Sequence, residues 1–229
     1  MSFLIGLLFL IQDVDTLYSY SGDGCVCYQG LTWSSCRDAS SGTAENGRDT
    51  LMAATSYDGF TTPATYGIAR AGISFPPLGI GSDITIDSVL VQITVKTSSN
   101  SPYAFLTDGY AADSSSIADG DYPGLLSTTL RSNDSITGTG AGKFWLDSTA
   151  ISGLSRSGGC NKFSILERND LRDFTPSDQR QIVFYSRESS TQTNRPILVI
   201  YTSTNDFPLD GRLRGGKWLT KGKVVIKTP

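Results

Sequence analysis

The clearest pattern of apolar and polar positions lies in residues 84–95, where the two kinds of side chain alternate. Successive side chains of a β-strand point to opposite faces, so a period of two predicts a strand with one buried face. One face carries Val89, Val91, Ile93 and Val95, and the other carries Ile84, Ile86, Ser88, Leu90 and Gln92, which is apolar only near its start. We therefore expect the valine and isoleucine face to lie in the core.

A second strand is expected just before this one, at residues 68–75. The segment between them contains Pro76 and Pro77, which lack backbone donors, and Gly79 and Gly81, which admit positive φ, so it is a loop rather than a helix. Further strands are expected at residues 50–55, 102–110, 125–130, 143–146, 162–167, 181–186 and 197–202. A short strand or hairpin is expected within 18–30 and a polar loop at 43–49. One helical turn is expected within 148–154, capped by Asp147 or Ser148. So many short strands predict an all-β fold.

The N-terminal segment is almost unbroken in its hydrophobicity. Its apolar residues are Phe3, Leu4, Ile5, Leu7, Leu8, Phe9, Leu10 and Ile11. A membrane span needs ~20 such residues, so this stretch is too short for one. A secretory signal has a basic start and a small-residue cleavage site, and neither is present here. The segment is therefore expected to be a buried strand of the chain's own sheet or an arm that packs against another subunit.

The C-terminal segment has the opposite character. Residues 206–229 hold six basic and two acidic side chains, a balance of +4, and the other 205 residues therefore carry −7. The segment includes Arg212, Arg214, Lys217 and Trp218. A basic tail on an acidic body docks electrostatically to a neighbouring copy or an acidic partner, and the alternative is a solvated hairpin. The whole chain carries only −3, so no nucleic acid or anionic membrane is expected as a general partner.

These differences divide the 229 residues into three parts. Residues 1–32 form an N-terminal arm with short strands, residues 33–203 a β-sandwich, and residues 204–229 a basic extension. A chain of this length is sufficient for one large β domain with short appendages.

Histidine is absent from the sequence, which excludes Ser-His-Asp and Cys-His catalysis. Carboxylate pairs run glycosidases without histidine, but 22 acidic residues make coincidental pairs inevitable and no spacing stands out. We expect no enzymatic activity and no cofactor.

The four cysteines are Cys25, Cys27, Cys36 and Cys160. Cys25 and Cys27 share one face of a strand and are poorly placed to bond each other. Buried thiols and structural disulfides both remain open, because four cysteines allow three pairings. A zinc site is a third alternative, although Cys-x-Cys is not the usual Cys-x2-Cys spacing.

Two kinds of loop residue are candidates for binding. Asp119 and Asp121 lie in an acidic loop and form a weak candidate calcium site, because hard cations take carboxylate oxygens. Sugar rings pack on aromatic faces, and the candidate glycan contacts are Tyr57, Phe60, Tyr103, Tyr110 and Tyr122.

Several short motifs carry a resemblance to a known family. They are W-S-S-C-R-D-A-S-S-G at 33–42, an arginine-containing strand running into Phe-Pro at 70–76, I-x-S-V-L-V-Q-I at 86–93, Asp121-Tyr122, and R-P-I-L-V-I-Y at 195–201. With these motifs the central region resembles the DNRLRE-type, carbohydrate-binding-module-like β-jelly-roll domains of bacterial surface proteins and phage virion proteins.

The resemblance implies a jelly-roll sandwich that is a non-catalytic module. Within it, Arg70 and Arg195 are expected to tie loops together at the rim through several hydrogen bonds. The expected function is that of a structural protein of a virus particle, as a head decoration, fibre or tail component, that assembles through its terminal arms with other virion or surface proteins. A homo-oligomer, by resemblance a trimer, is the expected form. The alternative is a secreted or cell-surface module that binds host glycans.

Overall fold

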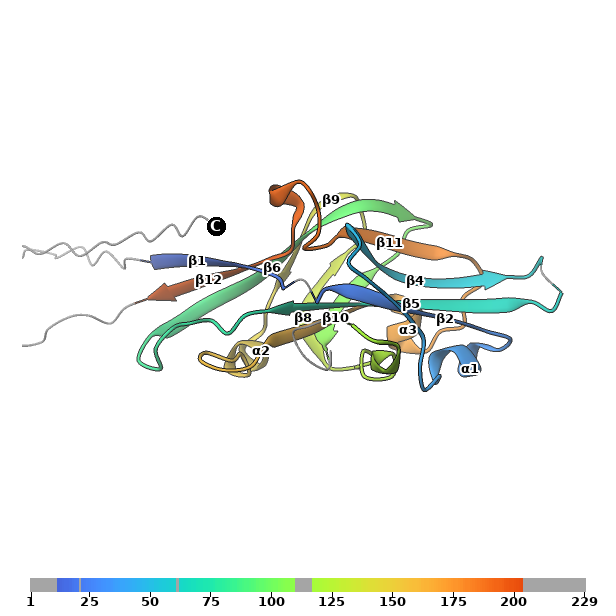
Figure 1. The fold of residues 1–229 in the computed structure, drawn as a ribbon, viewed down its shortest axis with the longest axis horizontal. Coiled ribbons are helices and arrows are strands. Elements are labelled where there is room, and N and C mark those ends of the chain that lie inside the picture. The colour runs from blue at the N-terminus through green and yellow to red at the C-terminus, as the bar shows by residue number, and fades with distance from the viewer. Residues whose placement is uncertain (1–11, 21, 61, 110–116, 204–229) are drawn as a thin grey trace, which may run out of the picture.

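The computed structural model describes residues 12–20, 22–60, 62–109 and 117–203 (Figure 1). Strands dominate the described residues, which confirms the all-β prediction. The strands are Gln12–Tyr18 (β1), Gly24–Gly30 (β2), Thr43–Asn46 (β3), Thr50–Asp58 (β4), Thr65–Phe75 (β5), Thr85–Ser99 (β6), Ala104–Asp108 (β7), Leu130–Ile136 (β8), Gly140–Trp145 (β9), Asn161–Glu167 (β10), Arg180–Tyr185 (β11) and Ile197–Ser203 (β12). The short helices are Trp33–Arg37 (α1), Ser148–Ser152 (α2) and Arg168–Arg172 (α3), with 3-10 turns at Asp119–Asp121 (η1) and Gln192–Asn194 (η2).

All the strands belong to one antiparallel sheet, whose main path runs β1-β12-β6-β11-β4-β5-β10-β7-β8. The two longest strands, β5 and β6, have partners along both of their edges. β6 pairs with β12 and β11 on one edge and with β9 on the other. A bridge between Ser132 and Leu146 then connects β8 to the end of β9, so the sheet folds back on itself around a core.

The interior is filled by the face of β6 that the alternation predicts. Val89, Val91 and Ile93 are fully buried and Val95 is nearly so, which confirms the prediction. They pack in one cluster with residues of the facing strands, including Ile73, Phe75, Leu106, Phe144, Ile165, Phe184 and Leu198.

Strand β5 is buried on both faces. Its inner side chains join the main core, and on its outer face Ile68 joins a second cluster with Val26, Trp33, Cys36, Ile117, Tyr122 and Leu125. These residues come from β2, α1 and the segment around η1, so a layer of short helices and loops covers the sheet here. This second core explains why β5 lacks a clean apolar–polar alternation.

Two expected elements differ from the structure. A strand at 125–130 is wrong, because β8 begins only at Leu130 and Leu125 instead packs in the second cluster. The loop expected at 43–49 contains β3, a polar strand whose one partner among the described strands is β2. An edge strand of this kind needs few apolar residues, so hydrophobic patterning does not reveal it.

The N-terminal part of the chain contributes to the sheet from Gln12 onward. β1 pairs with β12, and β2 pairs with β5, so residues 12–18 and 24–30 belong to the same sheet as the central region. The expected arms at 3–11 and 204–229 lie outside the described residues. Within the described ranges, no helix is long and apolar enough to cross a membrane.

Candidate functional site

The aromatic candidates for glycan contact divide into three groups. Phe60 is completely exposed, and Tyr57 and Tyr103 are more than one-third exposed. Tyr110 lies outside the described residues. Tyr122 is fully buried, and its hydroxyl donates to the carbonyl oxygen of Cys36 at 2.8 Å. The prediction of a glycan contact is therefore wrong for Tyr122, whose ring lies in the second core rather than at the surface.

The acidic candidates for calcium both accept hydrogen bonds from backbone N–H groups. Asp119 accepts from the backbone N–H of Ala44 at 2.7 Å, and Asp121 accepts from that of Ala118 at 2.9 Å. Asp119 thus joins the η1 segment to β3, and Asp121 stabilises the turn of η1 itself. In the part of the chain that the structure describes, neither belongs to a group of three convergent ligands.

Arg70 is the most deeply buried charged side chain of the outer layer. It is fully buried, and its guanidinium makes a bidentate pair with Asp170, with Nε–Oδ2 at 2.7 Å and Nη2–Oδ1 at 2.9 Å. It also donates to the carbonyl oxygens of Tyr122 and Arg37, and lies 4.1 Å from the centroid of the Tyr122 ring. One side chain on β5 therefore holds α1, α3 and the segment after η1 together.

Arg195 has a smaller version of the same role. Its Nε donates to the carbonyl oxygen of Ser189 at 2.9 Å, which ties the end of η2 to the preceding loop. Arg70 therefore ties loops together through several hydrogen bonds as predicted, but from a fully buried position rather than at the rim, and the Arg195 side chain ties one loop through a single described bond. Bidentate carboxylate binding explains why an arginine rather than a lysine is needed at position 70.

All four cysteines are free thiols in this structure, so none of the three possible disulfide pairings is present. Cys36 lies in α1 and donates to the carbonyl oxygen of Tyr28 at 3.3 Å, within the second cluster. Cys25 and Cys27 instead point to the main core on the other face of β2. The sheet thus separates Cys36 from this pair, while Cys160 precedes β10.

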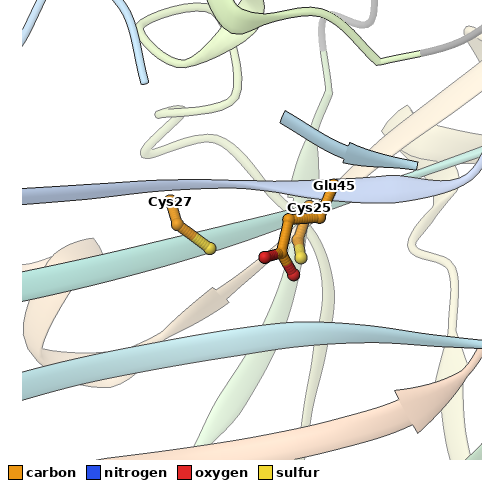
Figure 2. Close-up of side chains that lie close together, drawn as sticks. All are labelled: Cys25, Cys27 and Glu45. Atoms are coloured by element: carbon orange, nitrogen blue, oxygen red, sulfur yellow. The ribbon is translucent and has the colours of Figure 1, made fainter. Parts of the chain in front are cut away.

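The Cys25–Cys27 pair has a third neighbour that sequence reasoning missed. Glu45 on β3 lies directly opposite Cys25 in the β2–β3 pairing, and the ligand atoms of the three residues lie within 4.8 Å of one another. Figure 2 shows the three side chains projecting from these neighbouring strands. The sequence gives no sign of this neighbour, because β3 is not predicted as a strand and Glu45 is therefore not paired with Cys25.

The two thiols also influence each other. A hydrogen bond from Cys27 lowers the pKa of the Cys25 thiol, and the same interaction, followed by burial, raises the pKa of Cys27. Without a bound cation, the shared hydrogen bond therefore favours loss of the Cys25 proton and opposes loss of the Cys27 proton.

The predicted assembly residues Phe3, Leu4, Ile5, Leu7, Leu8, Phe9, Leu10, Ile11, Arg212, Arg214, Lys217 and Trp218 lie outside the described residues. The structure does place the points from which both segments start. Gln12 pairs with Ser203, the two strand ends lying side by side at one end of the molecule (Figure 1). No protein-family model matches this chain, and no curated protein matches it either.

Proposed function

We propose that this chain is a non-enzymatic structural subunit that assembles with other subunits through its two terminal segments. The observation that carries the proposal is the pairing of Gln12 with Ser203. The apolar segment 3–11 comes just before Gln12 in the sequence and the basic segment 204–229 follows Ser203, so the two segments are joined to neighbouring positions of the sheet. An apolar and a cationic segment attached at neighbouring positions are well placed to bind one surface of a neighbouring subunit, the first by burial of apolar side chains and the second by charge.

The strand at this origin also favours assembly. In the described part of the chain, β1 pairs with β12 alone and leaves its other edge without a partner. Val14 on this strand is 56% exposed. Proteins generally cover or block open strand edges, and a neighbouring subunit is one way to cover them.

A structural rather than catalytic role fits the chemistry of the chain. The sequence has no histidine. The buried Arg70 guanidinium, paired with Asp170, also donates to two backbone carbonyl oxygens and lies against the Tyr122 ring. The antiparallel sheet folded around its main core is compatible with a jelly roll. The resemblance to phage virion jelly rolls suggests a virus particle as the location and a trimer as the form.

Deletion of residues 1–11 tests the proposal. We expect this variant to keep the far-ultraviolet circular dichroism of the full chain and its cooperative unfolding, and to lose assembly in sedimentation velocity. Phe60→Ala is the matched control, because Phe60 is fully exposed and belongs to the connection between β4 and β5. This connection lies at the end of the molecule opposite the β1–β12 pair (Figure 1). A deleted chain that assembles with the stoichiometry of the full chain contradicts the proposal.

The exposure of Phe60 and Tyr57 favours glycan binding as a second candidate function. Exposed aromatic faces pack against sugar rings, and these two residues lie within or just after β4. A glycan array tests it: specific binding that Phe60→Ala removes supports this function, and no binding by the full chain contradicts it.

A further inference from the structure

The structure places two thiols and a carboxylate at one edge of the sheet, on β2 and β3. We propose that Cys25, Cys27 and Glu45 form a zinc site that fastens β3 to β2. All three residues belong to β2 and β3, and metal binding is measured independently of assembly.

The strand register explains why these three side chains converge. Residues two apart on a strand share a face, so Cys25 and Cys27 project to the same side of β2. Residues directly opposite in an antiparallel pair have Cβ atoms about 4.5–5.5 Å apart, and Glu45 is the residue opposite Cys25. The three ligand atoms consequently lie within 4.8 Å of one another without any change of register.

The donor set suits zinc better than it suits calcium or magnesium. Zinc binds thiolate sulfur at about 2.3 Å and carboxylate oxygen at about 2.0–2.2 Å, whereas calcium and magnesium prefer oxygen ligands alone. Tetrahedral bonds of these lengths place the ligand atoms roughly 3.5–3.8 Å apart, which requires only small side-chain movements from the present arrangement. Two sulfurs and one oxygen leave a fourth position for water or another donor.

The site is partly buried and is also open to solvent on one side. Cys25 is 2% exposed, while the Glu45 side chain is about one-third exposed. Cys27 lines a surface hollow of about 180 Å³ together with residues that include Met52, Gln29 and Gln181. An ion can therefore approach from the Cys27 side and remain held by a thiol that solvent hardly reaches.

Binding has a defined charge balance. Each thiol loses one proton to solvent, so two thiolates and one carboxylate surround a divalent cation and the site carries a net charge of −1. Arg48 forms an ion pair with Glu45 at 3.3 Å and remains beside the site to offset this charge. Because both members of that pair are substantially exposed, exchanging it for a metal bond meets little resistance.

The position of the ligands indicates what the ion would do. β3 is a four-residue strand that pairs with β2 alone, and it carries Glu45. A metal that joins Glu45 to two residues of β2 would hold this short edge strand in register. A ligand that binds the folded state alone also raises its stability in proportion to the logarithm of the ligand concentration.

Cobalt(II) titration of the reduced full-length chain tests the site, because Co²⁺ substitutes for Zn²⁺ and reports thiolate ligands by charge-transfer absorption. We expect one equivalent to bind with tetrahedral absorption bands and to be displaced by Zn²⁺. Zinc should also raise the midpoint of thermal unfolding of the same protein.

Variants identify the ligands. Cys25→Ser and Cys27→Ser should each weaken cobalt binding and reduce the charge-transfer band, and Glu45→Gln should keep the fold but weaken cobalt binding at least about tenfold. Cys160→Ser is the matched control, because Cys160 lies outside the cluster, and it should bind like the unaltered chain. The proposal is overturned if the reduced chain shows no thiolate band, if Cys25→Ser or Glu45→Gln binds like the unaltered chain, or if Cys160→Ser abolishes binding.

Discussion

Arg70 shows how a single residue organises the layer outside the sheet. Its guanidinium contacts Asp170 on α3, the carbonyl oxygen of Arg37 at the end of α1, and Tyr122 beyond η1. A buried ion pair of this kind is costly to desolvate, and the additional hydrogen bonds offset that cost. Removing Arg70 leaves the buried carboxylate of Asp170 without its bidentate partner and with only a longer ion pair, 3.8 Å from Nε of Arg37.

Arg70→Met should therefore lower the free energy of unfolding by about 3–5 kcal/mol in urea denaturation. Arg131→Met is the matched control, because Arg131 pairs with Asp108 at 2.6 Å in a partly exposed position, and its loss should cost no more than about 1 kcal/mol. Equal losses for the two variants would show that the Arg70 network does not hold the outer layer.

Asp23 is a second residue whose environment has a measurable consequence. Burial raises its pKa from 3.8 to about 7, although the Ser19 hydroxyl donates to its carboxylate at 2.6 Å and lowers the pKa in part. The backbone N–H groups of Ser74 and Arg187 also face it, and the charge of Glu188 raises the pKa slightly. The folded state therefore binds the Asp23 proton more tightly than the unfolded state does.

The sign of the resulting pH dependence follows from linkage. The contribution of Asp23 to stability is complete below about pH 4 and is lost as the pH rises through about 7. Between pH 5 and pH 8 the free energy of unfolding should fall by roughly 2 kcal/mol more for the unaltered chain than for Asp23→Asn. Urea denaturation at the two pH values measures this difference, and parallel behaviour of the two proteins would contradict it.

At the scale of elements, β5 combines two cores because each of its faces is covered. A Cβ at Gly72 on its outer face would lie 2.7 Å from Cδ1 of Ile117 and 3.1 Å from Cδ2 of Leu125. The covering segment thus packs directly on the backbone of the strand. This close approach is the reason for a glycine in the middle of β5.

Gly72→Ala should consequently destabilise the fold by about 1–3 kcal/mol through overpacking. Gly120→Ala is the control, because a Cβ there would meet no heavy atom of the described residues within 4 Å. Chemical denaturation of both variants checks the expectation. If Gly72→Ala proves as stable as Gly120→Ala, the segment carrying Ile117 and Leu125 does not pack on β5 as described.

The elements that sequence analysis predicts are those with a strong period of two or a continuous apolar run. β6 and β12 bury apolar side chains at regular positions, so their patterns are unambiguous. β3 and β8 carry mostly polar residues and escape the same reasoning. The helix α1 was also not predicted as a helix, because it is five residues long and depends on a Thr32–Ser35 capping box rather than on apolar periodicity.

Candidate sites were harder to predict than strands, because they depend on which strands become neighbours. The shared face of Cys25 and Cys27 follows from their spacing alone, but Glu45 joins them only through the β2–β3 register. Tyr122 shows the opposite case. Its place in a polar loop predicts exposure, and only the covering layer reveals that the ring is buried against Arg70.

At the scale of the whole molecule, the central claim is that the chain assembles with others through segments that start beside Gln12 and Ser203. The single chain has a mass of 24.6 kDa, so copy number is directly readable from the mass of the native complex.

Native mass spectrometry of the full-length chain, purified under non-denaturing conditions, is the most direct measurement. The account predicts a complex with a mass that is a multiple of 24.6 kDa, with three copies expected by resemblance. A single species of 24.6 kDa at every concentration, with no partner attached, would contradict it.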